Sequence, residues 1–314
     1  MKREPLPIPR KQASSTIEHK RTRDGSSSCQ PAAKVQRISS RSRRRTKVAA
    51  HQVGIKLKAP LYLDLSRSLI DAAGQAQIAA AVAFHDTLMH LSLGNCMLNP
   101  DMGSRLAKSL AVSSTLVSLK LRGNRFQVRA TRQIFQALSS NTTLTTLDLA
   151  SNGLKPILGP DIAQLLTTNS TLTRLDLSWN ILDEGGEQIA VALETNSTLT
   201  YLNLSDACLG SKAGVMLAKA LCVNRSLTSL VLAENGFEPQ LGEDFGAALR
   251  VNSVITRLDL TSNNIDYQPI VAALESSNFT LTSLCPAPFL QDIPPPYKHQ
   301  IEALLARNQS FIVV

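Results

Sequence analysis

The chain has 314 residues, of which 43% are hydrophobic but only 4% aromatic, so a hydrophobic core must be built from aliphatic side chains. The absence of any run of about 18 apolar residues excludes a membrane-spanning helix. The five cysteines are an odd number without a CxxC pair, which argues against a disulfide framework and a zinc site. No apolar stretch follows the N-terminal charges, so we expect no cleaved secretory signal and an intracellular protein, cytoplasmic or nuclear.

The net charge of +9 is concentrated at the N-terminus. Residues 1–50 hold 14 Lys/Arg against three Asp/Glu, whereas residues 51–314 hold 19 against 21. The first segment also contains no Phe, Tyr or Trp. Because such a segment cannot bury enough apolar surface to offset the entropy lost on ordering, we predict that residues 1–50 form a disordered basic tail.

A basic cluster, "RSRRRTK", lies near the end of this tail. Its cationic residues are Arg41, Arg43, Arg44, Arg45 and Lys47. The composition is typical of a nuclear-import signal, and it fits a solubilising arm equally well. Such an arm could contact the phosphates of a nucleic acid nonspecifically and in a salt-dependent way. The tail has no aromatic side chains to stack on bases, which argues against sequence-specific recognition of a nucleic acid.

Residues 51–284 contain a repeat of about 28 residues built on the pattern "LxxLxL". The first apolar position of each copy is Leu88, Leu116, Leu144, Leu172, Leu199, Leu227, Ile255 or Leu281. An earlier unit, "LYLDLS", fits the same register, although Pro60 takes its first apolar position. A fixed period of this length is the signature of a leucine-rich repeat.

The copy "TLTRLDLSWN" predicts a short strand followed by a turn. Leu172, Leu175 and Leu177 face one side of an extended segment, and Asn180 turns the chain. A side-chain amide at this turn can satisfy buried backbone groups. Five of the seven complete copies carry it, as Asn124, Asn152, Asn180, Asn235 and Asn263. Cys96 holds the place in the first copy, and Ala207 in the fifth cannot form the bonds, so we expect a local irregularity at Ala207.

The second half of each copy predicts a helix. In "GGEQIAVALETN", Ile189, Ala190 and Leu193 fall on one face. An asparagine closes most of these helices, and we expect it to adopt the left-handed C-terminal conformation. These asparagines are Asn141, Asn169, Asn196, Asn224 and Asn252. Since one strand and one helix cannot bury their apolar faces alone, the copies must stack into an α/β leucine-rich repeat solenoid, a horseshoe with a parallel sheet on its concave face and helices on its convex face.

The two ends of the sheet need covers, because an exposed edge invites aggregation. At the start, "VGIKLKAPLYLDL" alternates apolar residues and lysines as a capping strand would. At the end, residues 285–314 lose the repeat at a run of prolines, and "IEALLARN" then resumes the helix. We therefore predict a degenerate capping repeat at residues 285–314.

The strand–turn–helix unit resembles the ribonuclease-inhibitor-like class of leucine-rich repeats, from about residue 60 to residue 308. That resemblance implies recognition of a protein through the concave face and adjacent loops, without catalysis by the scaffold. No metal-ligand spacing, phosphate-binding loop or other enzyme signature is present, so we predict no cofactor and no metal. The leading hypothesis is a monomeric, non-enzymatic module that binds a protein partner, with the tail for targeting or electrostatic attraction.

Two alternatives remain open. The helices spelled "GxxIAxxL" and the closing "IEALLARN" are similar to GALA-type bacterial repeat proteins, which implies a bacterial effector secreted into a host cell without a cleaved signal. GALA-type proteins also carry an F-box, and no F-box helix set fits in residues 1–50. Ran GTPase-activating proteins share the repeat class, which implies a small-GTPase regulator. They end in an acidic region, whereas this chain ends in "FIVV".

The outward positions of the strands hold the candidate binding residues. Trp179 is the one tryptophan of the chain, and Tyr201 follows it in the next copy. Aromatic and arginine side chains are the usual energetic centres of protein interfaces. We therefore predict that the partner contacts Arg174, Asp176, Trp179, Tyr201, Asp206, Glu234 and Arg257. A tryptophan that merely covers the neighbouring strand, and aspartates that merely follow the usual "LDL" spelling, fit the same pattern.

Overall fold

The computed structural model describes residues 36–39, 61–284 and 293–311. The chain divides into two units, residues 1–34 and 35–314, and all described residues belong to the second. The basic cluster at residues 41–47 and the part of the predicted capping strand at residues 53–60 lie outside the described residues.

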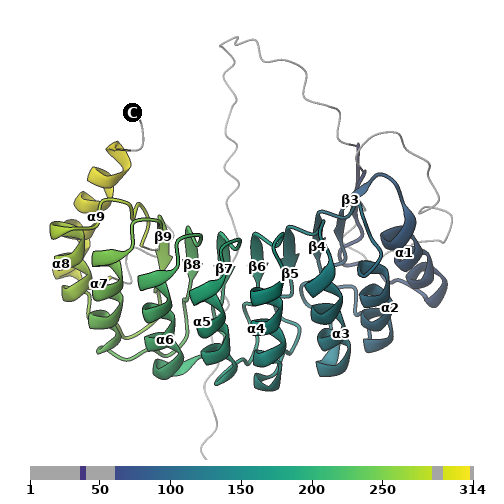
Figure 1. Cartoon of the computed structure of the whole chain (residues 1–314), viewed down its shortest axis with the longest axis horizontal. Helices are drawn as coiled ribbons and strands as arrows, with labels where there is room; N and C mark the ends of the chain where they lie inside the picture. The colour runs from purple at the N-terminus through teal and green to yellow at the C-terminus, as the bar shows by residue number, and fades with distance from the viewer. Residues whose placement is uncertain (1–35, 40–60, 285–292, 312–314) are drawn as a thin grey trace, which may run out of the picture. The chain divides into compact units, whose positions relative to one another are not determined.

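Strands and helices alternate along the second unit (Figure 1). The strands are β1 (Gln36–Ser39), β2 (Leu61–Asp64), β3 (Leu88–Ser92), β4 (Ser118–Lys120), β5 (Thr146–Asp148), β6 (Arg174–Asp176), β7 (Tyr201–Asn203), β8 (Ser229–Val231) and β9 (Arg257–Asp259). The helices are α1 (Ala72–Phe84), α2 (Pro100–Leu110), α3 (Gln127–Ser140), α4 (Gly159–Thr168), α5 (Gly185–Thr195), α6 (Gly210–Val223), α7 (Leu241–Val251), α8 (Gln268–Ser276) and α9 (Pro295–Ser310), with a short 3-10 helix at Pro156–Leu158.

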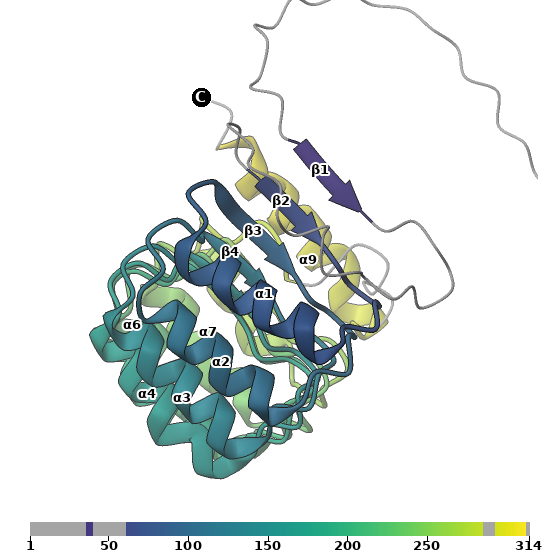
Figure 2. The same cartoon turned by 90° about the vertical axis from the view of Figure 1, so that its right-hand side faces the viewer.

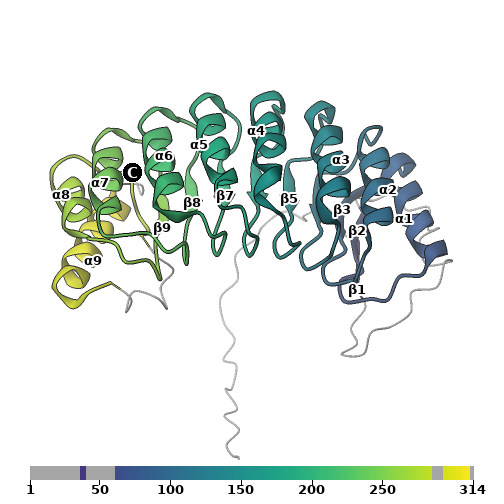
Figure 3. The same ribbon diagram turned by 90° about the horizontal axis from the view of Figure 1, so that it is seen from below.

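All nine described strands form one parallel sheet in sequence order. Figure 3 shows the helices in a row along the outer side of the arc and the strands along its inner side. Seen from its N-terminal end in Figure 2, the unit stacks successive strand–helix pairs behind one another. The predicted α/β leucine-rich repeat solenoid is therefore the fold of this unit.

The core lies between the sheet and the helices. In the copy around β6, Leu172, Leu175 and Leu177 are at most 3% exposed, and Ile189 and Leu193 cover them from α5. Burial of each such aliphatic side chain stabilises the fold by about 1.5–3 kcal/mol. Each copy needs the leucines of its neighbours for this burial, which explains why the pattern recurs in register.

The asparagine at the turn links neighbouring copies as predicted. The Asn180 amide nitrogen donates to the carbonyl oxygens of Leu149 (3.1 Å) and Leu177 (2.8 Å). Its oxygen accepts the N–H groups of Asn152 (3.0 Å) and Leu154 (2.9 Å). Because Asn180 is only 3% exposed, these bonds replace water for backbone groups on both sides of the turn.

The hydrogen bonding does change at Ala207. Its carbonyl oxygen accepts the N–H of Leu182 at 2.9 Å, where other copies use an asparagine side chain. The next residue, Cys208, adopts a left-handed conformation with φ of 54°. The pairing of β7 with β6 and β8 stays in register, so the irregularity is confined to the turn.

The prediction for the helix-closing asparagines is wrong. Asn169 has φ of −84° and ψ of 129°, which is extended rather than left-handed, and the other four are also extended. The Asn169 side chain instead donates to the carbonyl oxygens of Leu138 (2.7 Å) and Asn141 (3.0 Å) in the previous copy. It also accepts the N–H of Leu172 at 2.7 Å. These residues form a second asparagine ladder, which joins the copies at the opposite end of the strands.

Both ends differ in part from the sequence prediction. Within the segment predicted as a basic tail, Gln36–Ser39 form β1, which pairs in parallel with β2. At the other end, α9 begins at Pro295, six residues before the expected helix, because proline is tolerated in a first helical turn. Asn308 continues the second ladder by donating to the carbonyl oxygens of Asn278 and Leu281.

Candidate functional site

The strand register aligns the outward residues of successive copies into columns. One column runs His90, Ser118, Thr146, Arg174, Tyr201, Ser229, Arg257, and another runs Ser92, Lys120, Asp148, Asp176, Asn203, Val231, Asp259. Four of the seven predicted contact residues, Arg174, Asp176, Tyr201 and Arg257, therefore lie on the strands. The remaining three, Trp179, Asp206 and Glu234, follow the strand ends.

Arg174, Asp176 and Tyr201 form a contiguous cluster on β6 and β7. The guanidinium carbon of Arg174 lies 4.0 Å from the centre of the Tyr201 ring, a cation–π contact. Asp176 accepts the side-chain amide of Asn203 at 3.2 Å and the Ser178 hydroxyl at 2.6 Å. The cluster thus presents a flat cationic and aromatic surface beside an anchored carboxylate.

The charged groups around Tyr201 act on the pKa of its hydroxyl in opposite directions. Burial raises the pKa of the Tyr201 hydroxyl, and the Asp176 carboxylate raises it further. Arg174 and Arg257 oppose this shift and lower the pKa, as does a hydrogen bond with Asn203. The phenol therefore stays protonated and able to donate throughout the physiological range of pH.

Arg257 extends the cluster toward the C-terminal end of the sheet. It faces Ser229 in the pairing of β9 with β8. Within the described residues, the Arg257 Nε and the Ser229 hydroxyl are buried without a hydrogen-bond partner. Buried polar atoms are normally satisfied, so these two neighbouring exceptions at outward strand positions are unusual.

Trp179, Asp206 and Glu234 form what we call the rim row, just past the strand ends. All three have positive φ, of 60°, 48° and 59°, respectively. The same conformation recurs at this position in every described copy. It accompanies a backbone hydrogen bond to the next copy, and the N–H of Trp179, for example, donates to the Ser205 carbonyl at 2.8 Å. Left-handed backbone disfavours a bulky residue, so Trp179 is strained, and its side chain is 52% exposed.

The rim row and the strand cluster are neighbours in sequence, but they are not joined. Within the described residues, no hydrogen bond, ion pair or ring contact connects Trp179, Asp206 or Glu234 to Arg174, and none connects these three side chains to one another. Trp179 is about half exposed, so its side chain does not simply lie over the neighbouring strand.

Sequence reasoning missed a cavity of about 420 Å³ on the N-terminal half of the same face. The residues that line it are Asp64, Ser66, Arg67, Ser92, Gly94, Asn95, Lys120, Arg122 and Asp148. The sequence signal was present, because Ser92 is a small residue at an outward position where the flanking copies carry Asp64 and Lys120, and Gly94 lies beside Ser66 and Arg122. Burial raises the pKa of Asp148, as does nearby Asp176, whereas Arg122 and Lys120 lower it.

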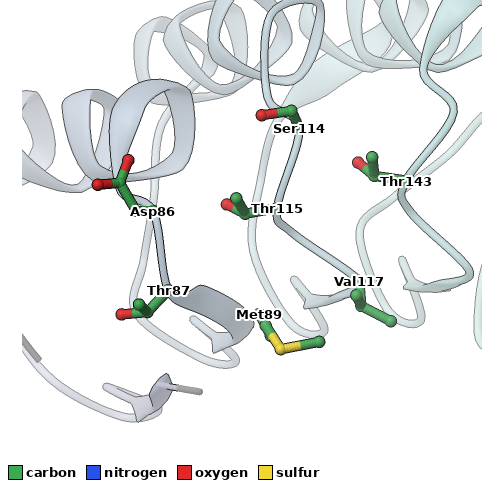
Figure 4. A pocket seen from close by; sticks show the side chains of 7 residues that line it. All are labelled: Asp86, Thr87, Met89, Ser114, Thr115, Val117 and Thr143. Atoms are coloured by element: carbon green, nitrogen blue, oxygen red, sulfur yellow. The ribbon is translucent and has the colours of Figure 1, made fainter. Parts of the chain in front are cut away.

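A second cavity, of about 530 Å³, lies where the strands begin. Figure 4 shows Thr87, Thr115 and Thr143 from three successive copies around it, with Met89 and Val117 on its strand side. Elsewhere this strand position holds threonines whose hydroxyls donate to the previous copy, as Thr145, Thr173, Thr200, Thr228, Thr256 and Thr282. Met89 and Val117 come before that ladder and carry no hydroxyl, so the strand side of the cavity is apolar.

In the part of the chain that the structure describes, no three His, Cys, Asp or Glu residues are placed to hold a metal ion. The helices described there are too short or too polar to cross a bilayer.

Comparisons with known proteins agree with the fold. A family model described as "Leucine Rich repeat" matches residues 140–156, 168–190, 195–218 and 251–268. No curated protein matches the sequence. Among solved structures, the leucine-rich repeat-containing protein LegL7 from Legionella pneumophila is 20% identical, with a TM-score of 0.50, over 79% of this chain and 81% of that one.

Two further solved structures are similar over a smaller part of the chain or with a lower score. An internalin, inlF, from Listeria monocytogenes is 18% identical over 72% of this chain and 68% of that one, with a TM-score of 0.44. The structure of leiomodin-1 actin-binding site 2 is 20% identical over 50% of this chain and 88% of that one, with a TM-score of 0.41. At these identities the likeness concerns the fold alone.

Proposed function

We propose that this leucine-rich repeat protein is a non-enzymatic module that binds a protein partner through the concave face of its sheet. The observation that carries the proposal is the Arg174–Tyr201 stack beside the unsatisfied Arg257 Nε and Ser229 hydroxyl. Arginine and tyrosine lose little conformational freedom when they are already packed, so such pairs are efficient contact residues. The proposed contacts are Arg174, Asp176, Trp179, Tyr201, Asp206, Glu234 and Arg257.

The strain at Trp179 supports the same face. A left-handed tryptophan that stays half-exposed contributes little to the core and costs backbone energy. Strained residues of this kind cluster at binding sites, where a partner supplies the compensating contacts. Asp206 and Glu234 extend the row with carboxylates, so we propose that the partner offers cationic groups opposite them.

Affinity capture from native lysate tests this proposal, with the intact chain and two triple variants as baits. The first variant carries Arg174→Ala, Trp179→Ala and Tyr201→Ala. The matched control carries Ser118→Ala, Thr146→Ala and Ser151→Ala, which occupy the same columns on earlier copies. We expect one specific protein to be lost with the first variant only, at an unchanged melting temperature. Retention of that protein by the first variant would overturn the proposed face.

We also propose that the basic cluster at residues 41–47 directs the protein or strengthens its attraction to the partner. The support is compositional: five cations occur within seven residues. Replacing Arg41, Arg43, Arg44, Arg45 and Lys47 by Gln in the full chain should weaken capture at low salt or alter cellular distribution. If neither changes, the cluster has no targeting or binding role.

A further inference from the structure

The polar cavity on the N-terminal half of the concave face shares no lining residue with the proposed protein-binding set, although its Asp148 pairs with Asp176 of that set. It lies over β3, whose outward residues near the strand end, Ser92 and Gly94, are small and buried. Ser92 pairs with Asp64 on one side and with Lys120 on the other. The cavity therefore exists because two small residues separate larger side chains on the flanking copies.

Three cations surround Ser92 and Gly94, which form the floor of the cavity. Arg67 follows β2, Lys120 ends β4, and Arg122 lies two residues further along. The ion pairs of the described residues join Arg132 to Asp161, Lys212 to Glu187 and His299 to Glu302, so none of the three cavity cations is paired. Their charges come from both sides of β3, which suits a ligand that can accept hydrogen bonds in several directions at once.

The two carboxylates of the cavity are engaged by their own loops. Asp64 accepts the N–H of Ser66 at 3.0 Å, and Asp148 accepts that of Ala150 at 3.0 Å. The hydroxyls of Ser66 and Ser92 lie 2.6 Å apart on the floor and can turn their remaining hydrogen toward a ligand. Three cations against two carboxylates leave the cavity with a net charge of +1, so the expected ligand is an anion.

We propose that this cavity binds a phosphate monoester group. A tetrahedral phosphate offers three terminal oxygens to cations on two sides, whereas a planar carboxylate offers two in one plane. The volume of about 420 Å³ exceeds that of the phosphoryl group alone and leaves room for the group that carries it. None of the residues that line this site belongs to the proposed protein-binding set, and the proposal does not depend on that set.

The test follows the backbone amide resonance of Ser92 in the full chain at low salt, where electrostatic contacts are least screened. The probes are an acetylated, amidated Gly–phosphoserine–Gly tripeptide, its serine and glutamate counterparts, and inorganic phosphate. We expect the phosphoserine tripeptide to shift the resonance and to bind at least about tenfold more tightly than the serine and glutamate tripeptides. Comparison with inorganic phosphate then distinguishes an ester carried on a peptide from a free ion.

Matched variants decide whether the cavity itself is responsible. Lys120→Gln and Arg122→Gln should each weaken binding about tenfold, whereas Lys108→Gln, an exposed cation on α2, should leave it unchanged. Asp148→Asn should strengthen binding about threefold, because it removes a negative charge and keeps the acceptor for Ala150. A methyl group at Gly94 would lie 3.5 Å from the Ser66 hydroxyl, so Gly94→Ala fits the fold and should weaken binding about threefold.

Three results would overturn the proposal: no probe shifts Ser92, the glutamate tripeptide binds as tightly as the phosphoserine one, or the shift persists in Lys120→Gln and Arg122→Gln. Because no protein partner enters the assay, these results leave the proposed protein-binding face untouched.

Discussion

The two halves of the solenoid share one scaffold but carry opposite charge. Residues 61–158 hold nine Lys/Arg against five Asp/Glu, a net charge of +4, whereas residues 159–284 hold six against 14, a net charge of −8. The first half contains the cationic cavity, and the second contains the aromatic cluster and the acidic part of the rim row. The same repeat therefore supports two chemically different surfaces.

This difference shows how a solenoid separates stability from recognition. The leucines and asparagines that join the copies point into the core or lie within the turns, and they recur in both halves. The outward residues contact few neighbours, so their charge can vary from copy to copy without altering the fold. Changes to the scaffold should therefore affect both halves, and changes to the face only one.

The largest effect should come from the turn asparagines. Asn180→Ala removes five hydrogen bonds and leaves buried backbone groups unsatisfied, so we expect a loss of about 3 kcal/mol in the free energy of unfolding. Asn124→Ala in the first half removes three such bonds and should cost about 2 kcal/mol. Urea unfolding measures both, with the exposed Lys108→Ala as control. A negligible cost in either half would refute a shared scaffold.

High pH should distinguish the halves next. Burial raises the pKa of the Cys96 thiol to about 11. Cys96 replaces the turn asparagine in one copy of the first half, whereas the residue that replaces it in the second half, Ala207, has no ionisable group. Since the folded state holds the proton more tightly than the unfolded chain, this contribution is complete below about pH 9 and is lost as the pH rises toward 11. The loss should be about 2 kcal/mol.

The free energy of unfolding of the intact chain and of Cys96→Ala, measured between pH 8 and pH 11, isolates the contribution of the thiol. The variant should lose less stability over that interval, because other groups titrate equally in both proteins. Parallel curves would show that the thiol is not responsible.

The columns of the face were predictable, because a 28-residue period fixes which residues align. The role of Asn169 was not predictable from the sequence. An asparagine fits both the end of a helix and a hydrogen bond to the previous copy, and only the stacked structure shows that Asn169 makes the hydrogen bond. The left-handed conformation at the position of the rim row was also missed. Asn95, Gly123 and Asp206 hold this position in their copies and are of types that tolerate the conformation, but Trp179 is not. The cavity was also missed, because the prediction rested on large outward residues, whereas small ones create the cavity.

Replacing left-handed residues by glycine should have a similar effect on stability in the two halves but a different effect on partner binding. Trp179→Gly and Ser151→Gly, both in the left-handed rim position, should each raise the free energy of unfolding by about 1 kcal/mol. Only Trp179→Gly should abolish capture of the partner, since Ser151 lies outside the proposed contacts. Urea unfolding and affinity capture measure the two effects. A stabilised Trp179→Gly protein that still captures the partner would mean that the strain has no binding role.

The smallest expected effect concerns the Arg174–Tyr201 pair. A cation–π contact at a partly exposed site is worth about 0.5–1 kcal/mol, so a double-mutant cycle with Arg174→Ala and Tyr201→Leu should give a coupling energy of that size in the free protein. Pairing Arg257→Ala with Tyr201→Leu should give less, because Arg257 acts on Tyr201 from two strands away. Since Arg174 lowers the pKa of Tyr201, Arg174→Ala should also raise that pKa, measured by tyrosinate absorbance. Zero coupling and an unmoved titration would mean that the ring and the guanidinium do not interact before the partner binds, and the surface would then not be preorganised.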